Sequence, residues 1–153
     1  MPPANLDTPR TVDDIGSDNV TFPRCRFLIM EEITTDDAPP SIGPFSQGIR
    51  DGDTVHVSGQ GPIDPDSGER IDGDIRDETD RTLRNVAAVL VAAGASLDDV
   101  RKTTVYVCDM DDYDEINDVY AEHFSPPYPA RSAVEVSDLP VDIGVEIEVV
   151  ATV

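Results

Sequence analysis

The stretch from Asp74 to Ala93 spaces its apolar side chains as an α-helix does. The positions that recur every three or four residues are Ile75, Thr79, Leu83, Val86, Leu90 and Ala93. This spacing puts them on one helical face. Acidic residues occupy the first turns, where the helix dipole favours negative charge, and Gly94 follows the last turn as a stop. Because a helix with one apolar face needs a second layer to cover it, the stretch predicts a layered domain.

Strand patterns on both sides of this helix supply the second layer. In residues 143–153, Ile and Val alternate with Gly and Glu, as in a strand with one buried face. Further strands are predicted at 46–50, 54–59, 103–108 and 132–136, with a weaker one at 26–33, and a second helix at 111–124 ends at the sequence SPPYP. The order β-β-α-β-α-β-β, with five or six strands, predicts an α+β domain with both helices packed on one sheet face.

The length of 153 residues suits a single domain. Residues 1–25 contain four prolines and no sustained period, so they are predicted to form an irregular N-terminal extension. The folded domain is then expected over residues 26–153. Met30 opens a segment that would also serve as the start of the protein.

The chain is strongly acidic, with 32 Asp and Glu against 11 Lys and Arg and a formal charge of −21. Lys102 is the only lysine. Such a surface is typical of a protein that lives in molar salt, where the Debye length falls to about 3 Å and self-repulsion is screened. We therefore expect a halophilic protein. Nucleic acid and anionic membranes are poor partners for this charge.

Other classes of protein are also disfavoured. No apolar run approaches the roughly 20 residues of a transmembrane helix, and the N-terminus lacks the basic and apolar regions of a secretory signal. Two cysteines are too few for a disulfide framework. We expect free thiols, a buried and inert Cys108, and a cytoplasmic location.

Generic signals of chemistry are few. There is no Cys–His metal spacing, so no metal is expected, and His56 and His123 are better explained as structural residues. Arg131 opens a strand and could hold a carboxylate by a two-point fork. Glu146 and Glu148 share one face of the last strand, where burial could raise a carboxyl pKa and suit it to acid–base work. The alternative is a structural Arg–Glu pair with the other Glu in solvent.

Four segments from residue 38 onward resemble the RidA/YjgF family of reactive-intermediate deaminases. The segments are APPSIGPFSQG (38–48), VSGQGPIDPDSGE (57–69), residues 81–124, and PARSAVEVSDLPVDIGVEIEVVA (129–151). The resemblance implies a chorismate-mutase-like fold with a mixed sheet. It also implies a homotrimer whose ligand clefts lie between neighbouring subunits. The implied enzyme is a 2-iminobutanoate/2-iminopropanoate deaminase, a hydrolase acting on C–N bonds.

The same resemblance implies the substrates. Members hydrolyse 2-imino acids and their enamine tautomers, such as 2-aminoacrylate and 2-iminobutanoate, to 2-keto acids and ammonia, and they need no cofactor or metal. The expected ligand is therefore a small 2-imino or 2-keto acid.

Site residues follow position by position from this resemblance. Arg131 matches the carboxylate-binding arginine and Glu146 the carboxylate that orients water. Ser58 and Gly59 match the cleft lining, Asn117 and Tyr120 match pocket positions on the second helix, and the backbone N–H of Ala133 can donate to the substrate carboxylate.

Three departures from the family pattern matter. Ala133 stands where many bacterial members have Cys, Phe45 stands where Tyr is frequent in IGPY, and the N-terminal extension has no counterpart. Phe45, a candidate substrate-binding residue, removes a hydroxyl from the pocket. This leaves two alternatives open: a divergent member acting on another small carboxylate substrate, and a non-enzymatic ligand-binding or regulatory trimer.

The charge predicts a salt-dependent stability. Self-repulsion should destabilise the fold in dilute buffer, so the midpoint of thermal unfolding should rise between dilute buffer and about 2 M KCl. Scanning calorimetry across a KCl series measures this, with sucrose as a control that does not screen charge. Equal midpoints at both ends of the series would contradict the prediction.

Overall fold

A computed structural model describes residues 30–153, so the predicted extension at 1–25 and the first part of the strand predicted at 26–33 lie outside the described residues. The strands are β1 (Glu31–Ile33), β2 (Gly48–Asp51), β3 (Thr54–Gln60), β4 (Val100–Val107), β5 (Ala130–Glu135) and β6 (Val145–Thr152). The helices are α1 (Ile75–Ala92) and α2 (Tyr113–His123), with short 3-10 turns at Leu97–Asp99 and Met110–Asp112.

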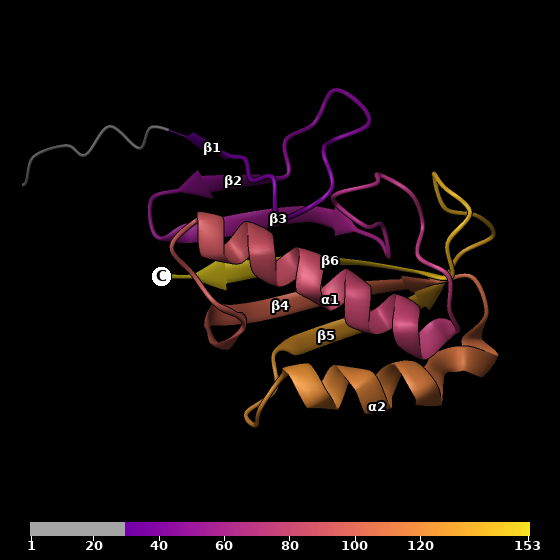
Figure 1. Ribbon diagram of the computed structural model, residues 1–153. Coiled ribbons are helices and arrows are strands. Elements are labelled where there is room, and N and C mark those ends of the chain that lie inside the picture. Colours follow the sequence, from indigo (N-terminus) through magenta and orange to yellow (C-terminus); the bar gives the residue numbers. More distant parts are fainter. Residues whose placement is uncertain (1–29) are drawn as a thin grey trace, which may run out of the picture.

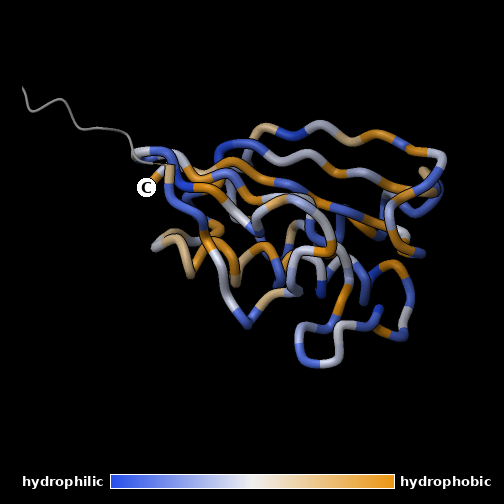
Figure 2. The backbone as a smooth tube through the Cα atoms, turned by 90° about the horizontal axis from the view of Figure 1, so that it is seen from above, coloured by the Kyte–Doolittle hydropathy of each residue, from blue (hydrophilic) through white to orange (hydrophobic). Residues whose placement is uncertain are grey.

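The six strands form one mixed sheet in the order β1-β2-β3-β6-β4-β5. Neighbours are antiparallel except β4 and β5, which run parallel. Both helices lie on the same side of the sheet (Figure 1). Figure 2 views the two layers from above, with the strands along one side and the helices along the other. The prediction of an α+β domain with helices on one face is confirmed.

The helix α1 forms where the apolar period predicts it. Asp74 caps its N-terminus by accepting from the backbone N–H of Arg76 and Asp77, and the Asp77 carboxylate accepts from the Asp74 N–H in return. This capping box satisfies N–H groups that the helix leaves free. After the last turn, Gly94 takes a φ of +77°, which glycine adopts without a Cβ penalty.

The core lies between α1 and the centre of the sheet. Strand β6 contributes alternate residues to it, since Val145, Ile147, Val149 and Ala151 are all buried. The largest buried side chains that face them from α1 include Leu83, Val86 and Leu90. Burial of this kind stabilises by about 25 cal/mol for each Å² of apolar surface removed from water.

Among residues 30–153, no helix lies over the other face of the sheet. The residues of β6 between the buried positions are half-exposed. On β4 the half-exposed or exposed side chains, Lys102, Thr104 and Tyr106, pair in register with Val150, Glu148 and Glu146. Lys102, the only lysine, donates from Nζ to Ser132 Oγ at 2.7 Å here. We call this side of the sheet the uncovered face.

Strand β6 begins two residues later than predicted. Ile143 forms a tight turn, donating its N–H to Val141 O at 2.8 Å. Gly144 is then held on both sides: its N–H donates to the buried Glu78 carboxylate at 2.7 Å, and its carbonyl accepts from the Cys108 N–H at 3.0 Å. Glu78 also accepts from Arg70 Nε at 2.9 Å. These contacts replace the sheet ladder, so Ile143 is buried without belonging to the strand.

Two other expectations need correction. The order is β-β-β-α-β-α-β-β, because the weak first strand does form, over Glu31–Ile33, and pairs with β2. Cys108 is exposed instead of buried, since it follows the last residue of β4. Its Sγ lies 3.3 Å from Ile143 O.

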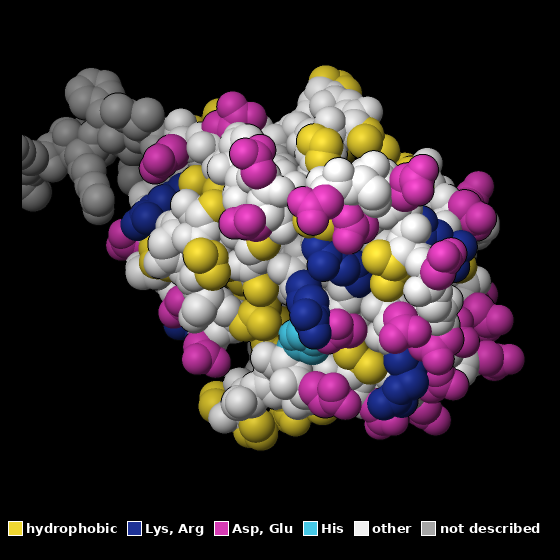
Figure 3. All heavy atoms as spheres, in the orientation of Figure 1, with side chains coloured by type: hydrophobic (Ala, Val, Ile, Leu, Met, Phe, Trp, Pro, Cys, Tyr) yellow, Lys and Arg dark blue, Asp and Glu magenta, His cyan; other side chains and the backbone are white. Residues whose placement is uncertain are grey.

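Acidic side chains dominate the helix-covered face. Figure 3 shows Asp and Glu over most of that face, gathered most densely at its lower right, with few Lys and Arg among them. No helix within residues 30–153 is long and apolar enough to cross a membrane.

Candidate functional site

Arg131 sits at the edge of the sheet, on the side that the helices cover. Its Cα pairs with that of Thr103 on β4, and Thr103 is buried beneath α2. The guanidinium donates from Nη2 to Tyr113 Oη at 2.9 Å and to Asn117 Oδ1 at 2.6 Å. It also lies 4.6 Å from the ring centroid of Tyr120 and 5.5 Å from that of Tyr113. At such distances the electron-rich face of an aromatic ring attracts a cation.

The spacing of α2 creates this cradle. Tyr113, Asn117 and Tyr120 are four and three residues apart, so they share one helical face. The Tyr120 hydroxyl and Thr103 Oγ1 form a buried hydrogen bond of 2.9 Å, which ties α2 to β4. The helix α2 therefore holds three side chains against the guanidinium of Arg131, in a position set by its contact with β4.

No carboxylate pairs with Arg131 within residues 30–153. The ion pairs of this part of the chain involve Arg70, Arg76, Arg84 and His123. The alternative of a structural Arg–Glu pair is therefore wrong for Arg131. In a chain of charge −21, a cation that two neutral groups and two rings hold in place is suited to receive an anion.

The backbone beside Arg131 offers a further donor. Strand β5 is the last of the sheet, and the Val136 N–H donates inward to Val107 O at 2.8 Å. Because N–H groups along a strand point to alternate sides, the Ala133 N–H points to the open edge. Arg131 and Ala133 lie on the same face of β5. A carboxylate at this edge would meet one charged and one backbone donor.

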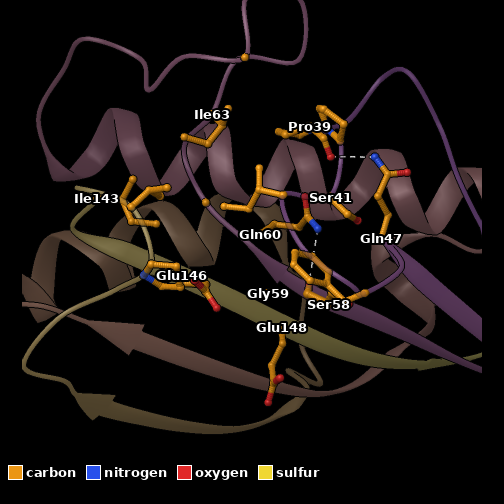
Figure 4. Close-up of a pocket in the computed structure, with 17 residues that line it drawn as sticks. Pro39, Ser41, Gln47, Ser58, Gly59, Gln60, Ile63, Ile143, Glu146 and Glu148 are labelled. Carbon is orange, nitrogen blue, oxygen red and sulfur yellow. Dashed lines mark hydrogen bonds between the residues drawn. The ribbon is translucent and has the colours of Figure 1, made fainter.

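Glu146 belongs to a pocket on the uncovered face of the sheet. The pocket holds about 440 Å³ and is lined by Phe45, Ser58, Gly59 and Glu148 among others. Figure 4 shows Glu148 of β6 below Ser58 and Gly59 of β3, and Glu146 of β6 to their left. The Glu146 carboxylate lies over Gly59, where a Cβ would overlap its Oε1 atom. Glycine at this position is therefore a condition for seating the carboxylate.

The loop over the pocket depends on a buried amide. Gln47 donates from Nε2 to Thr35 O, Ala38 O and Pro39 O at 2.8 to 3.1 Å, and its Oε1 accepts from the Thr35 N–H at 2.7 Å. The contact with Pro39 is dashed in Figure 4. These bonds hold the proline-rich segment that forms one wall. Phe45 in this wall is half-exposed.

Burial raises the pKa of Glu146 above the ordinary range of a glutamate, and the charge of Glu148 raises it further. Glu148 accepts from the Tyr106 hydroxyl at 3.2 Å, while no hydrogen bond of the described residues reaches the Glu146 carboxylate. A carboxyl whose pKa is higher in the folded state favours folding most when protonated, and that contribution is lost as pH rises through the raised pKa. A half-buried carboxyl without a hydrogen-bond partner among the described residues is suited to exchange a proton with a molecule in the pocket.

The predicted site residues thus form two half-sites. Arg131, Ala133, Asn117 and Tyr120 gather at the helix-covered edge, and Phe45, Ser58, Gly59 and Glu146 gather at the pocket. Thr103 pairs with Arg131, whereas Tyr106, three residues further along β4, pairs with Glu146. Because successive strand residues alternate in direction, the two half-sites lie on opposite faces of the sheet. One chain cannot bring them together.

Sequence reasoning missed Tyr113. Its spacing from Asn117 and Tyr120 is that of one helical face, but nothing in the sequence shows that its hydroxyl reaches Arg131. His123 Nε2 lies 2.8 Å from Asp80 Oδ1 on α1, a contact that fits the structural role predicted for it. Among the residues from Met30 onward, no group of three or more His, Cys, Asp or Glu is arranged to hold a metal ion.

Comparison with known proteins gives the class. The family model described as Endoribonuclease L-PSP matches residues 35–153. A RutC family protein of Pyrococcus horikoshii is 53% identical over 121 residues, which cover 79% of this chain and 96% of that protein. The chain therefore belongs to the Endoribonuclease L-PSP family, to which the RutC and RidA proteins also belong.

Two further relatives are more specific. The human 2-iminobutanoate/2-iminopropanoate deaminase is 40% identical over 124 residues, covering 81% of this chain and 90% of that protein. The crystal structure of Escherichia coli TdcF with bound serine superposes with a TM-score of 0.76 at 43% identity, covering 80% of this chain and 98% of that one. The fold implied by the resemblance to RidA is confirmed.

The pKa of Glu146 should respond to its neighbour. Replacing Glu148 with Gln removes one of the two causes of the raised pKa, so the pKa of Glu146 should fall but stay above that of an exposed glutamate. Carbon-13 NMR titration of the side-chain carboxyls measures this directly. Glu122→Gln, at an exposed position of α2, should leave the Glu146 titration unchanged. An unchanged titration in Glu148→Gln would show that burial alone raises it.

Proposed function

We propose that this protein hydrolyses 2-imino acids and their enamine tautomers, such as 2-aminoacrylate and 2-iminobutanoate, to 2-keto acids and ammonia. The observation that carries the proposal is the pair of half-sites: an arginine that has no acidic partner among residues 30–153, and a half-buried carboxylate with a raised pKa. The relatives at 40% identity that are named as deaminases support the choice of substrate.

The two half-sites divide the work. Arg131 and the Ala133 N–H hold the substrate carboxylate, which fixes the position of the imine carbon. Glu146 accepts a proton from water as the oxygen attacks the carbon of the protonated imine, and a neutral carbinolamine forms. Glu146 then gives this proton to the nitrogen. As the C–N bond breaks with its electron pair going to nitrogen, the hydroxyl oxygen forms the C=O bond and returns its own proton to Glu146. Ammonia leaves and takes up that proton, which restores the carboxylate. A carboxyl whose pKa lies above that of an exposed glutamate suits both steps, because it holds a proton more readily and can still release it.

The site requires more than one copy of the chain. Arg131 and Glu146 lie on opposite faces of one sheet, so a substrate that touches both must lie between two chains. We propose a homotrimer in which the uncovered face of each copy packs against a neighbour. In such a ring, each copy contacts the next one head to tail. Three equivalent contacts close the ring and produce three such sites.

The acidic surface favours a small carboxylate substrate over RNA. Phosphate recognition normally draws on clustered Lys and Arg, and the described residues contain a single lysine, Lys102.

Two alternatives to the proposal are a divergent member that acts on another carboxylate and a binding trimer without turnover. The next test gives a different outcome for each of them.

Wild-type protein in about 2 M KCl should accelerate hydrolysis of 2-iminobutanoate generated in situ by an amino-acid oxidase, with semicarbazide competing for the imine. Arg131→Ala should lower kcat/KM by about 100-fold or more, because the charged two-donor hold is lost. Glu146→Gln should abolish turnover yet keep binding of 2-ketobutyrate, measured by calorimetry. The control is Arg84→Ala, an exposed position on α1.

The outcomes separate the alternatives. Retained turnover in Glu146→Gln would contradict the mechanism. A folded trimer that binds 2-ketobutyrate but accelerates nothing would be the binding trimer, and acceleration of a different carboxylate substrate alone would be the divergent member.

A site shared between copies predicts complementation. Arg131→Ala and Glu146→Gln, each inactive alone, should recover about a quarter of wild-type activity when they are refolded together in equal amounts, because one interface in four then combines an intact Arg131 with an intact Glu146. Each variant refolded alone is the control. A mixture that stays inactive, with mixed trimers present by native mass spectrometry, would place the whole site within one chain.

A further inference from the structure

Arg131 is already engaged by neutral acceptors at one nitrogen. Nη2 carries two N–H donors, and it has two acceptors, the Tyr113 hydroxyl at 2.9 Å and the Asn117 carboxamide oxygen at 2.6 Å. Within residues 30–153, Nη1 and Nε of the same side chain have no hydrogen-bond partner.

The two-point fork of an arginine needs Nη2. A carboxylate that binds end-on takes one N–H from each Nη nitrogen, and one that binds side-on takes one from Nη2 and one from Nε. Both arrangements share Nη2, and its donors are occupied. A substrate carboxylate must therefore displace one acceptor or accept a single bond from Arg131.

Tyr113 is the acceptor that can leave. Its bond to Nη2 is the longer of the two, it is the first residue of α2, and its side chain is only partly buried. Its hydroxyl can therefore turn to water at little cost. Asn117 holds the shorter bond, and the buried Tyr120 ring keeps the guanidinium in position from below. Loss of the hydroxyl contact would leave the cation oriented.

We propose that the Tyr113 hydroxyl occupies the donor of Arg131 that a carboxylate ligand takes, so that the ligand binds by displacing it. Tyr113 thereby sets the affinity of the anchor: it holds the guanidinium when the site is empty and competes with the carboxylate. This inference rests on the proposed function for the identity of the ligand, a 2-keto or 2-imino acid.

The decisive variant is Tyr113→Phe. It keeps the ring beside Arg131 and removes only the competing hydroxyl, so the Kd for 2-ketobutyrate should fall by about three- to tenfold, as expected for a hydrogen bond to a charged group that is partly replaced by water. Isothermal titration calorimetry of the full-length assembled protein in KCl measures the Kd. The matched control is Tyr128→Phe, which removes the hydroxyl of an exposed tyrosine with no hydrogen-bond partner in the described chain and should leave the Kd unchanged.

A spectroscopic signal tests the displacement itself. The chain has four tyrosines and no tryptophan, so near-ultraviolet circular dichroism reports the tyrosines. Adding 2-ketobutyrate should change this spectrum in the wild type, and the change should shrink in Tyr113→Phe but not in Tyr128→Phe. Weaker or unchanged binding in a folded Tyr113→Phe would overturn the proposal, since the hydroxyl would then support the anchor or do nothing to it.

Failure of this inference and failure of the proposed function look different. Tighter binding in Tyr113→Phe without imine hydrolysis by the wild type would support the displacement and reject the deaminase. Imine hydrolysis by the wild type with an unchanged Kd in Tyr113→Phe would do the reverse.

Discussion

The alternation of β6 is the constraint on which the rest of the molecule depends. This strand lies in the sheet between β3 and β4, so each residue must point either to the helices or away from them. Its odd-numbered residues form the centre of the core, and Glu146 and Glu148 consequently point to the uncovered face. A shift of one residue would exchange the two sets and bury both carboxylates under α1. The stability of the core and the placement of the acid thus have one origin.

The second constraint is electrostatic. The chain has nearly three acidic residues for each basic one. Arg70, Arg76 and Arg84 are paired to carboxylates, and two other described arginines donate to backbone carbonyls. Arg131 differs because α2 offers it an amide, a hydroxyl and two rings instead. Neutral partners orient the guanidinium without cancelling its charge. The charge of Arg131 therefore remains available to attract an anion.

Much of this arrangement could be predicted from the residues. The period of 3.6 located α1 to within a residue at each end, and the alternation at 143–153 identified the strand that carries Glu146. The start of that strand could not be predicted, because it depends on Glu78, distant in the sequence, reaching Gly144. The partners of Arg131 were only partly predictable for the same reason: Asn117 and Tyr120 came from a family resemblance, whereas the bond to Tyr113 depends on how α2 lies against β5.

Gly59 gives the carboxylate half-site an unusual genetic signature. At most positions of a chain, replacement by alanine removes atoms and reveals what a side chain contributes. At Gly59 the same replacement adds an atom, and that atom would occupy the volume of the Glu146 carboxylate. The position therefore has no functional group to delete, yet any side chain there would push the Glu146 carboxylate out of its present place. In a library of substitutions screened for the position of this carboxylate, Gly59 would appear as a site where added atoms matter, rather than one where a particular side chain is required.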